Sequence, residues 1–227
     1  APEVARRAAL SGEVEAIMFS VNPAFDLLPA TASLDDAFTF GYADELGGMD
    51  PARAELYALC EREGVGLTVM KGYAGGRLFS AEASPFGVAM TPVQCIHYAL
   101  TRPAVASIMA GFGEPSHVAD ACAYETADDA AKDYASVLAG APRHAYFGQC
   151  TYCGHCAPCP KGIDVATVTK FLNLARAQGM VPETVREHYA ALPHKAGECV
   201  ACGACEKRCP FGVSIRANMK EAAETFG

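Results

Sequence analysis

Eight of the eleven cysteines in this chain gather in two short runs near the C-terminus, and this clustering constrains the chain more than any other feature. Each run places three thiols at intervals of three residues, and a fourth follows directly before a proline. A tight, non-helical loop with this spacing can present three thiols to one centre. The proline stops a helix from drawing the fourth thiol away. The runs are Cys150-x2-Cys153-x2-Cys156-x2-Cys159-Pro160 and Cys199-x2-Cys202-x2-Cys205-x3-Cys209-Pro210.

The spacing is typical of ligands to iron–sulfur cubes. The second run fits the bacterial ferredoxin signature residue for residue, and the first has one residue fewer in its last gap. Each iron of a cube takes one soft thiolate, and in two-cluster ferredoxins the fourth Cys of each run binds the other cluster. The sequence therefore predicts two 4Fe–4S clusters. Their predicted ligands are Cys150, Cys153, Cys156 and Cys209 for one cluster, and Cys199, Cys202, Cys205 and Cys159 for the other.

Two other uses of clustered cysteines fit the pattern less well. Zinc sites usually take their thiolates as separated pairs, whereas here four lie within ten residues. A disulfide framework belongs to secreted proteins, and the odd total of 11 Cys leaves one without a partner. Free clustered thiols are typical of a reducing compartment, so the sequence predicts a cytoplasmic protein.

Charge and composition divide the chain. Its 227 residues, 51% of them hydrophobic, can form one large domain or two small ones. Residues 1–143 carry 9 basic and 19 acidic groups, and residues 144–227 carry 9 and 7. This shift predicts a domain boundary at 143/144, with the mild basicity of the second domain offsetting the negative charge of its clusters. The acidic balance argues against nucleic acid as a partner, and the absence of a run of 18 apolar residues argues against a membrane span.

The first 143 residues alternate predicted strands and helices. The expected strands are 14–21, 65–70 and 105–110, and the expected helices are 2–11, 51–63, 91–101, 116–124 and 126–138. Such alternation predicts parallel β/α units, in which ligands bind at the carboxyl ends of the strands. Those ends are Asn22-Pro23, Lys71-Gly72 and Gly111-Phe112-Gly113. The last precedes a helix whose free N–H groups can hold a phosphate, although an ordinary βα loop shows the same pattern.

In the second domain, helices are predicted between and after the cysteine runs, at 164–178, 182–191 and 214–224. His144 and His155 flank the first predicted cluster, where a histidine can tune a cluster by hydrogen bonding to sulfur, although the sequence favours surface histidines at both positions. Tyr146, Tyr152 and Phe211 are expected to exclude water from the clusters. The remaining cysteines are expected to be small core residues, and they are Cys60, Cys95 and Cys122.

Four segments of the first domain together resemble the aldo/keto reductase family. They are Asn22-Pro23-Ala24-Phe25-Asp26, the Lys71-Gly72 loop, Met90-Thr91-Pro92-Val93-Gln94 and the Gly111 loop. Cys150–Ile163 and Cys199–Ile215 look like the subgroup with an appended two-cluster ferredoxin domain. The resemblance implies that residues 1–143 are the C-terminal part of a TIM (β/α)8 barrel, holding its sixth to eighth strands, and that residues 144–227 are a helical dicluster domain. Since no Met and no strand precede the first helix, we expect a fragment or a processed chain.

The resemblance implies an oxidoreductase that couples a nucleotide and carbonyl-type site to electron transfer through the two clusters, acting on a small-molecule substrate or with a redox partner protein. The catalytic Asp, Tyr, Lys and His of the family lie on earlier strands, so the catalytic residues here are unknown. The implied NADP(H)-binding residues are Asn22, Lys71, Gly72, Tyr73, Gly111, Phe112, Gly113, Ser116 and His117. Met18 and Met70 replace a Gln and a Tyr that many members use to hold the nicotinamide, which leaves a flavin as an alternative. A ferredoxin-like carrier without substrate chemistry is the other alternative.

Overall fold

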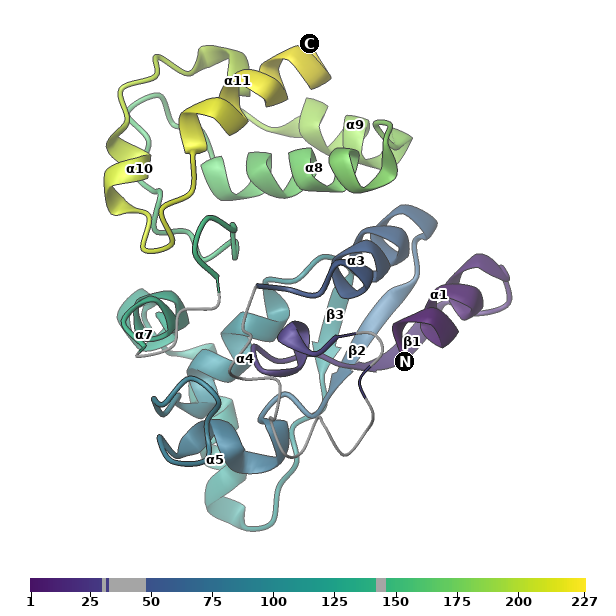
Figure 1. Cartoon of the computed structure of the whole chain (residues 1–227), viewed down its shortest axis with the longest axis vertical. Coiled ribbons are helices and arrows are strands. Elements are labelled where there is room, and N and C mark those ends of the chain that lie inside the picture. The colour runs from purple at the N-terminus through teal and green to yellow at the C-terminus, as the bar shows by residue number, and fades with distance from the viewer. Residues whose placement is uncertain (30–31, 33–47, 142–145) are drawn as a thin grey trace. The chain divides into compact units, whose positions relative to one another are not determined.

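The computed structural model of this chain describes residues 1–29, 32, 48–141 and 146–227. These residues form two compact units, Ala1–Tyr146 and Phe147–Gly227. In Figure 1 the first runs from purple to teal and the second from green to yellow. The predicted boundary at 143/144 and His144 both lie outside the described ranges.

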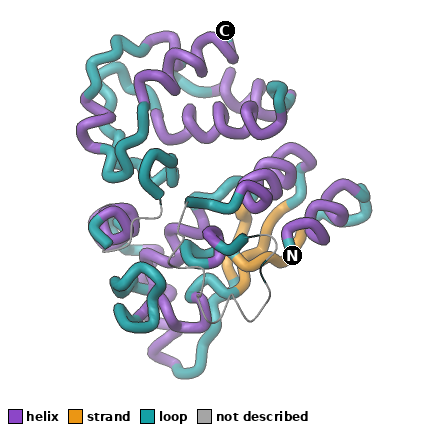
Figure 2. Tube along the Cα trace, in the orientation of Figure 1, coloured by secondary structure: helices purple, strands orange, loops and turns teal. Residues whose placement is uncertain are grey.

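The first unit is built on a parallel sheet of three strands in the order β1-β2-β3. The strands are β1 (Ala16–Ser20), β2 (Gly66–Met70) and β3 (Val105–Ile108). They alternate with α1 (Pro2–Leu10), α3 (Pro51–Glu63) and α4 (Pro92–Leu100). Ala16 pairs with Gly66 and Ser20 with Met70, while the register between β2 and β3 shifts at Leu67/Thr68. The predicted parallel β/α arrangement is thus present (Figure 2).

The prediction that this unit is part of a TIM barrel is wrong. The structure shows a small open sheet with many helices, and in the described residues it has three strands. A barrel requires closure of a sheet on itself, which needs many more strands. Alternation of strands and helices is a local pattern, and an open sheet and a barrel share it. The sequence could therefore indicate parallel strands without indicating whether the sheet closes.

The core of the first unit lies on one face of the sheet. Phe19, Leu67 and Val69 are buried there against side chains of α3, chiefly Leu56 and Tyr57. Successive residues of a strand point to opposite faces, so Met18 and Met70 come to the other face, where they are 52% and 36% exposed. The period of two therefore accounts for the difference between these neighbouring apolar residues.

The ends of α3 and α4 follow directly from their capping residues. Asp50 accepts hydrogen bonds from the N–H groups of Ala52 (3.0 Å) and Arg53 (3.3 Å), and Gly64 ends α3 with a φ of 67°. Thr91 and Gln94 form a capping box that begins α4. These two helices match the predicted ranges.

The predicted helix 126–138 is broken, because two aspartates cap separate helices within it. The Asp128 carboxylate accepts from Ala131 N–H and begins α6 (Asp129–Lys132), and the Asp133 carboxylate accepts from Ser136 N–H and begins α7 (Tyr134–Ala139). Before them come α5 (Pro115–Cys122) and the 3₁₀ turn η4 (Ala123–Glu125). Cys60 and Cys95 are buried as expected, but Cys122 is exposed. The remaining 3₁₀ turns of this unit are η1 (Phe25–Leu27) and η3 (Ala74–Phe79).

The second unit packs helices around the two cysteine runs. The helices are α8 (Val165–Gln178), α9 (Glu183–Ala191), α10 (Ala204–Arg208) and α11 (Ile215–Phe226), with the 3₁₀ turn η5 (Ala196–Glu198). Val168 and Leu172 of α8 and Met219 of α11 are buried in its core. Arg176 of α8 donates to Glu221 of α11 at 2.6 and 2.8 Å, which joins the two helices at the surface.

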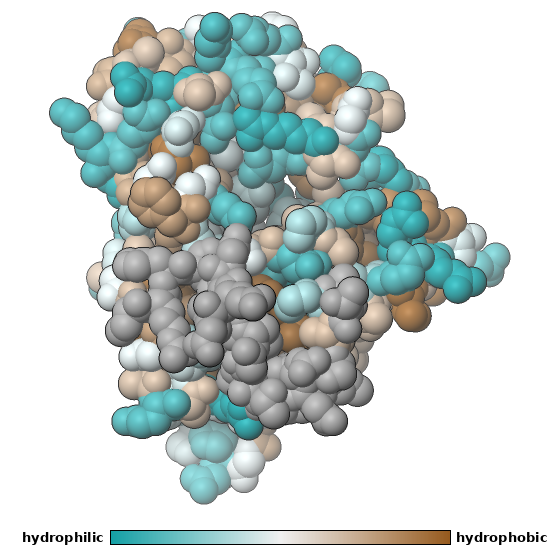
Figure 3. All heavy atoms as spheres, in the orientation of Figure 1, coloured by the Kyte–Doolittle hydropathy of each residue, from teal (hydrophilic) through white to brown (hydrophobic). Residues whose placement is uncertain are grey.

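Hydrophilic and hydrophobic side chains are interspersed over the face shown in Figure 3. Among the residues that the structure describes, no helix has the length and apolar character that crossing a membrane requires.

Candidate metal centre

The two cysteine runs have the same backbone design. In each run the residue two positions after the first Cys has a positive φ, 58° at Tyr152 and 52° at Ala201. The residue after the second Cys is a glycine with positive φ, 84° at Gly154 and 72° at Gly203. These left-handed residues turn the chain between the first and second cysteines and again after the second. The runs then differ, because Cys205, the third cysteine of the second run, lies in the short helix α10, whereas Cys156 of the first run lies in a loop.

The repeat continues beyond the closing Cys-Pro pair of each run. Gly162 and Gly212, three residues after the closing cysteines, have φ values of 71° and 62°. Helix α8 then begins after Asp164, and helix α11 begins after Ser214, at equivalent positions. The Asp164 carboxylate caps α8 by accepting from Thr167 N–H at 3.1 Å. Each run is therefore one copy of a unit made of loop, Cys-Pro, glycine turn and helix.

These units bring the eight cysteines together around two cavities. The lining of the first cavity includes Cys150, Cys153, Cys156 and Cys209. The lining of the second includes Cys199, Cys202, Cys205 and Cys159. Three cysteines of each cavity thus come from one run, and the fourth comes from the end of the other run. This is the grouping that the spacing predicts for two cubes.

The cysteine geometry fits a four-iron cube better than a single ion. Among the described residues, no group of three or more His, Cys, Asp or Glu side chains is arranged to hold one metal ion. A cube takes one thiolate on each of its four irons, so its ligands surround a space larger than an ion. Two cavities, each with four cysteines in its lining, meet that requirement.

Burial disfavours ionisation of several of these thiols. It raises the pKa of Cys156 to about 12, and the neighbouring Cys150 and Cys153 sulfurs add to the rise. Burial also raises the pKa values of Cys153 and Cys205. A cationic iron centre reverses this preference, because coordination stabilises the thiolate directly.

The two runs hold each other in place through residues next to the ligands. Arg208 stands between Cys205 and Cys209 in the second run. Its guanidinium donates to the carbonyls of Cys156 (2.6 Å) and Pro158 (2.7 Å) in the first run. The Gly148 N–H, before the first run, donates to the Phe211 carbonyl after the second at 2.6 Å. These contacts of backbone and side chain hold the two runs together, so that each run can supply the fourth cysteine of the other run's cavity.

Phe211 lines the first cavity, and the sequence predicted that this residue excludes water from a cluster. Tyr152 does not appear in that lining, and its hydroxyl accepts a hydrogen bond from Asn173 at 3.1 Å. His155 also lines the first cavity, and it is half-buried. The expectation that Tyr146 shields a cluster is replaced by another role for this residue, in the buried network of the first unit described below.

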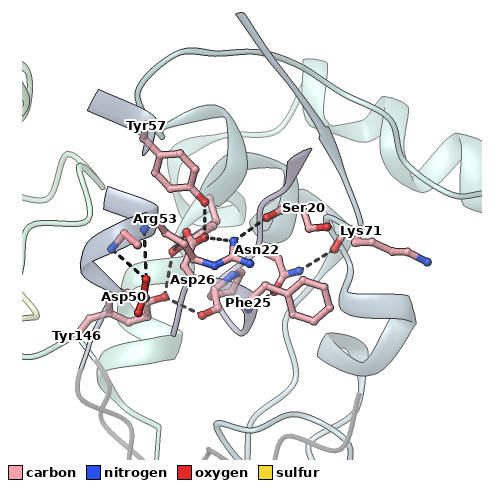
Figure 4. Close-up of polar contacts among 12 residues, drawn as sticks. Ser20, Asn22, Phe25, Asp26, Asp50, Arg53, Tyr57, Lys71 and Tyr146 are labelled. Carbon is pink, nitrogen blue, oxygen red and sulfur yellow. Dashed lines mark hydrogen bonds and ion pairs between the residues drawn. The ribbon is translucent and has the colours of Figure 1, made fainter. Parts of the chain in front are cut away.

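The residues predicted to bind a nucleotide lie after the end of β1, in the loops that follow β2 and β3, and at the start of α5. Asn22 is fully buried, its amide donates to the Lys71 carbonyl (2.8 Å) and its side-chain oxygen accepts from Phe25 N–H (2.8 Å) (Figure 4). It therefore ties the ends of β1 and β2 together, and its polar atoms are engaged within the chain. At Gly72 an added Cβ would lie 2.6 Å from Ile108 Cδ1, so glycine allows the close approach to β3.

The other predicted nucleotide residues lie in loops after β2 and β3. Lys71 is exposed, while Tyr73 is half-buried with its ring 4.9 Å from that of Phe79. The Tyr73 hydroxyl is buried without a hydrogen-bond partner among the described residues, and burial raises its pKa to about 12. The loop after β3 and the start of α5 are exposed, and Gly113 N–H donates to His117 Nδ1 at 3.1 Å. The residues there are Gly111, Phe112, Gly113, Ser116 and His117.

A buried polar network around Asp26 was not expected from the sequence. Its carboxylate accepts hydrogen bonds from the hydroxyls of Tyr57 (2.5 Å) and Tyr98 (2.7 Å), and Arg53 Nη1 lies 3.6 Å away. The Tyr146 hydroxyl lies 3.0 Å from that of Tyr98 and donates to the Pro23 carbonyl (2.7 Å). Figure 4 shows Arg53 and Tyr57 of α3 directed toward Asp26, with Tyr146 nearby. One feature of the sequence could have indicated the network. Asp26 follows a strand closely, and an acid buried at such a position requires polar partners.

Burial raises the pKa of Asp26 above its usual range, and Arg53 and the two phenols counteract part of that rise. Burial also raises the pKa values of Tyr57, Tyr98 and Tyr146, and the Asp26 carboxylate reinforces the effect. The three phenols therefore remain hydrogen-bond donors at neutral pH. The network satisfies a buried acid within the first unit.

Residues 149–214 match a protein-family model described as a 4Fe-4S dicluster domain. No curated protein and no solved structure matches the chain. The matched segment holds all eight clustered cysteines. The other residues that line the two cavities also lie in it, except Ile215, Arg216 and Met219, which follow it directly. The chain thus contains an iron–sulfur dicluster domain, which indicates a role in electron transfer.

Proposed function

We propose that this chain transfers electrons through two 4Fe–4S clusters, each held by three cysteines of one run and the last cysteine of the other. The observation that carries this proposal is the pair of cavities, each with four of the eight cysteines in its lining. Each cluster, when bound, supplies reversible transfer of one electron. The first would be held by Cys150, Cys153, Cys156 and Cys209, and the second by Cys199, Cys202, Cys205 and Cys159.

The rest of the dicluster domain positions these ligands and limits the access of water to them. Val165, Phe211 and Ile215 line the first cavity with apolar surface, and all three are buried. Because each centre takes one cysteine from the other run, neither run can complete its own site. We therefore expect the two centres to assemble together.

Anaerobic purification followed by iron and sulfide analysis tests the ligand assignment. The intact chain should bind about eight of each per molecule and give the electron paramagnetic resonance spectrum of two interacting reduced clusters. Cys209→Ser should weaken the first centre, although Cys209 belongs to the second run. Cys122→Ser is the matched control, because Cys122 is exposed on α5 outside both cavities. Stoichiometric zinc, or a single cluster, would contradict the proposal.

A second candidate function is an oxidoreductase of aldo/keto reductase type, in which the first unit binds NADP(H) and exchanges electrons with the clusters. The resemblance in sequence supports it. The observation in its favour is that the loops carrying Lys71 and Gly111–Gly113 follow adjacent parallel strands at their carboxyl ends. The number of electrons in a hydride, two, equals the capacity of two one-electron centres. The other reactant would be a small-molecule carbonyl compound or a redox partner protein.

Anaerobic mixing of the intact protein with NADPH and methyl viologen distinguishes the two candidates. If Lys71→Ala lowers the rate of viologen reduction and Lys220→Ala does not, a nucleotide site at the end of β2 is supported. Lys220 is an exposed lysine of α11 and serves as the charge-matched control. Full cluster content without detectable NADPH binding would contradict the nucleotide site and leave an electron carrier.

A further inference from the structure

The two cysteine cavities differ in the charge of their linings. The lining of the first includes His155 but no Lys, Arg, Asp or Glu among the described residues. The lining of the second includes three cationic side chains, those of Lys161, Arg208 and Arg216. The two runs share their turn pattern, and the difference in charge lies in the side chains that line the cavities.

The three cations of the second cavity do not contribute equally. Arg216 donates to the Glu206 carboxylate at 2.7 Å, which compensates its charge. Lys161 is exposed. The pKa of the nearby Glu198 carboxyl is lowered chiefly by its hydrogen bond with His194, and the charge of Lys161 adds a small part. Arg208 donates to the carbonyls of Cys156, Pro158 and, at 3.4 Å, His155, and in the described part of the chain it forms no ion pair. Arg208 therefore brings the positive charge that is least neutralised.

The cysteines of the two cavities also differ in their exposure. Cys202 of the second cavity is exposed, whereas the four cysteines of the first are half-buried. Val200 in the lining of the second cavity is 58% exposed, while Ile163 and Met219 in the same lining are buried. The first cavity is lined by Thr151, Thr169 and Phe211, which are 2%, 1% and 3% exposed. An added electron increases the negative charge of a centre, so water and nearby cations favour reduction, while apolar burial opposes it. Both differences act in the same direction.

We propose that the two centres have unequal reduction potentials, with the centre at Cys159, Cys199, Cys202 and Cys205 reduced first, and that Arg208 maintains part of this difference. This inference rests on the proposed pair of clusters. Arg208 acts as a positioning and electrostatic residue and is not a cluster ligand. The guanidinium lines the second cavity and not the first, and its hydrogen bonds to the Cys156 and Pro158 carbonyls hold it in place.

A potentiometric titration of the intact protein, followed by electron paramagnetic resonance, tests the order of reduction. Cys202→Ser, which alters one ligand of the second centre, identifies the signal of that centre in the wild type. We expect this signal to appear at the higher potential. A first signal unaffected by Cys202→Ser would overturn the proposal, whereas failure of the underlying function would show earlier, as iron and sulfide well below eight per molecule.

Variants of Arg208 separate its charge from its contacts. Arg208→Gln should reduce the preference for the second centre about three- to ten-fold, measured as the ratio of the two reduced signals at one fixed potential. Arg208→Lys keeps the charge and should keep the order of reduction. Lys220→Gln, which removes an exposed charge of α11 outside the second cavity, is the control and should leave the ratio unchanged.

Two results would overturn the role of Arg208. One is an unchanged ratio in Arg208→Gln at full iron content. The other is loss of iron or sulfide from Arg208→Gln while Arg208→Lys retains both, because the residue would then act only by holding the loops.

Discussion

The two units of this chain treat their buried polar groups in opposite ways. In the first unit, Asp26 is fully buried and finds its partners inside the same unit, in Tyr57, Tyr98 and Arg53. In the second unit, the eight clustered thiols are free of disulfide bonds and line two cavities. The first unit therefore satisfies its buried acid by itself, whereas we expect the second, although it has a core of its own, to gain stability from what its cysteines bind.

Removal of iron should therefore produce the largest difference between the units. A metal centre that assembles with its fold contributes about 10 kcal/mol or more to folding, by analogy with structural metal sites. After chelation under anaerobic conditions, amide hydrogen exchange should become much faster in peptides from α8 and α11 and stay unchanged in α3 and α4. Equal loss of protection in both units would show that the first unit also depends on the bound iron.

Substitution of Asp26 should have the next largest effect, and on the other unit. Asp26→Ala leaves Tyr57 and Tyr98 without the acceptor that they share and Arg53 without its ion-pair partner, which should cost about 3–5 kcal/mol of unfolding free energy. Asp26→Asn keeps the shape and one acceptor and should cost less. Hydrogen exchange resolved by peptide should report this loss in α3 and α4. An effect confined to the second unit would contradict the assignment.

A glycine in the second unit should show a smaller effect that depends on its neighbour. Gly162 has a φ of +71°, and an added Cβ would lie 2.8 Å from the His194 ring. His194 Nδ1 lies 2.9 Å from Glu198 Oε2, so the ring cannot move freely. Gly179 has a similar φ of +64° with no atom within 4 Å. Gly162→Ala should therefore cost more than Gly179→Ala, whose cost of about 1 kcal/mol reflects the backbone alone.

Denaturant unfolding of both glycine variants, followed by the absorbance of the bound clusters, measures this difference. Equal losses would show that the His194 ring moves aside. That outcome would mean that position 162 requires glycine only for its backbone conformation.

The sequence predicted best what neighbouring residues determine. Spacing within each run indicated three ligands, and the predicted helix 51–63 has the bounds of α3. The fold class was wrong because sheet closure depends on strands far apart in the chain. The partners of Asp26 come from positions 57, 98 and 53, and no local pattern relates them. The hydrogen bond from Asn22 to the Lys71 carbonyl is likewise a contact between distant residues. The sequence predicted Asn22 as a nucleotide-binding residue and gave no sign of this contact.

The pH dependence of the first unit should show the smallest effect, because opposing influences meet at Asp26. Burial raises its pKa above the ordinary value of 3.8, while Arg53 and the phenols lower it. A raised pKa means that the folded state binds the proton more tightly than the unfolded state. The resulting stability is fully present below pH 3.8 and is lost as the pH rises through the folded-state pKa.

Hydrogen exchange of α3 and α4, corrected for the intrinsic effect of pH on exchange, should therefore indicate a free energy of unfolding that falls as the pH rises above 3.8. Asp26→Asn should remove this slope, because an amide does not titrate in this range. A slope of the opposite sign in the wild type would mean that Arg53 and the phenols outweigh burial, so that Asp26 is held as the carboxylate. The sign of the slope thus decides whether the first unit neutralises its buried acid by proton or by ion pair, and it does so within the unit in either case.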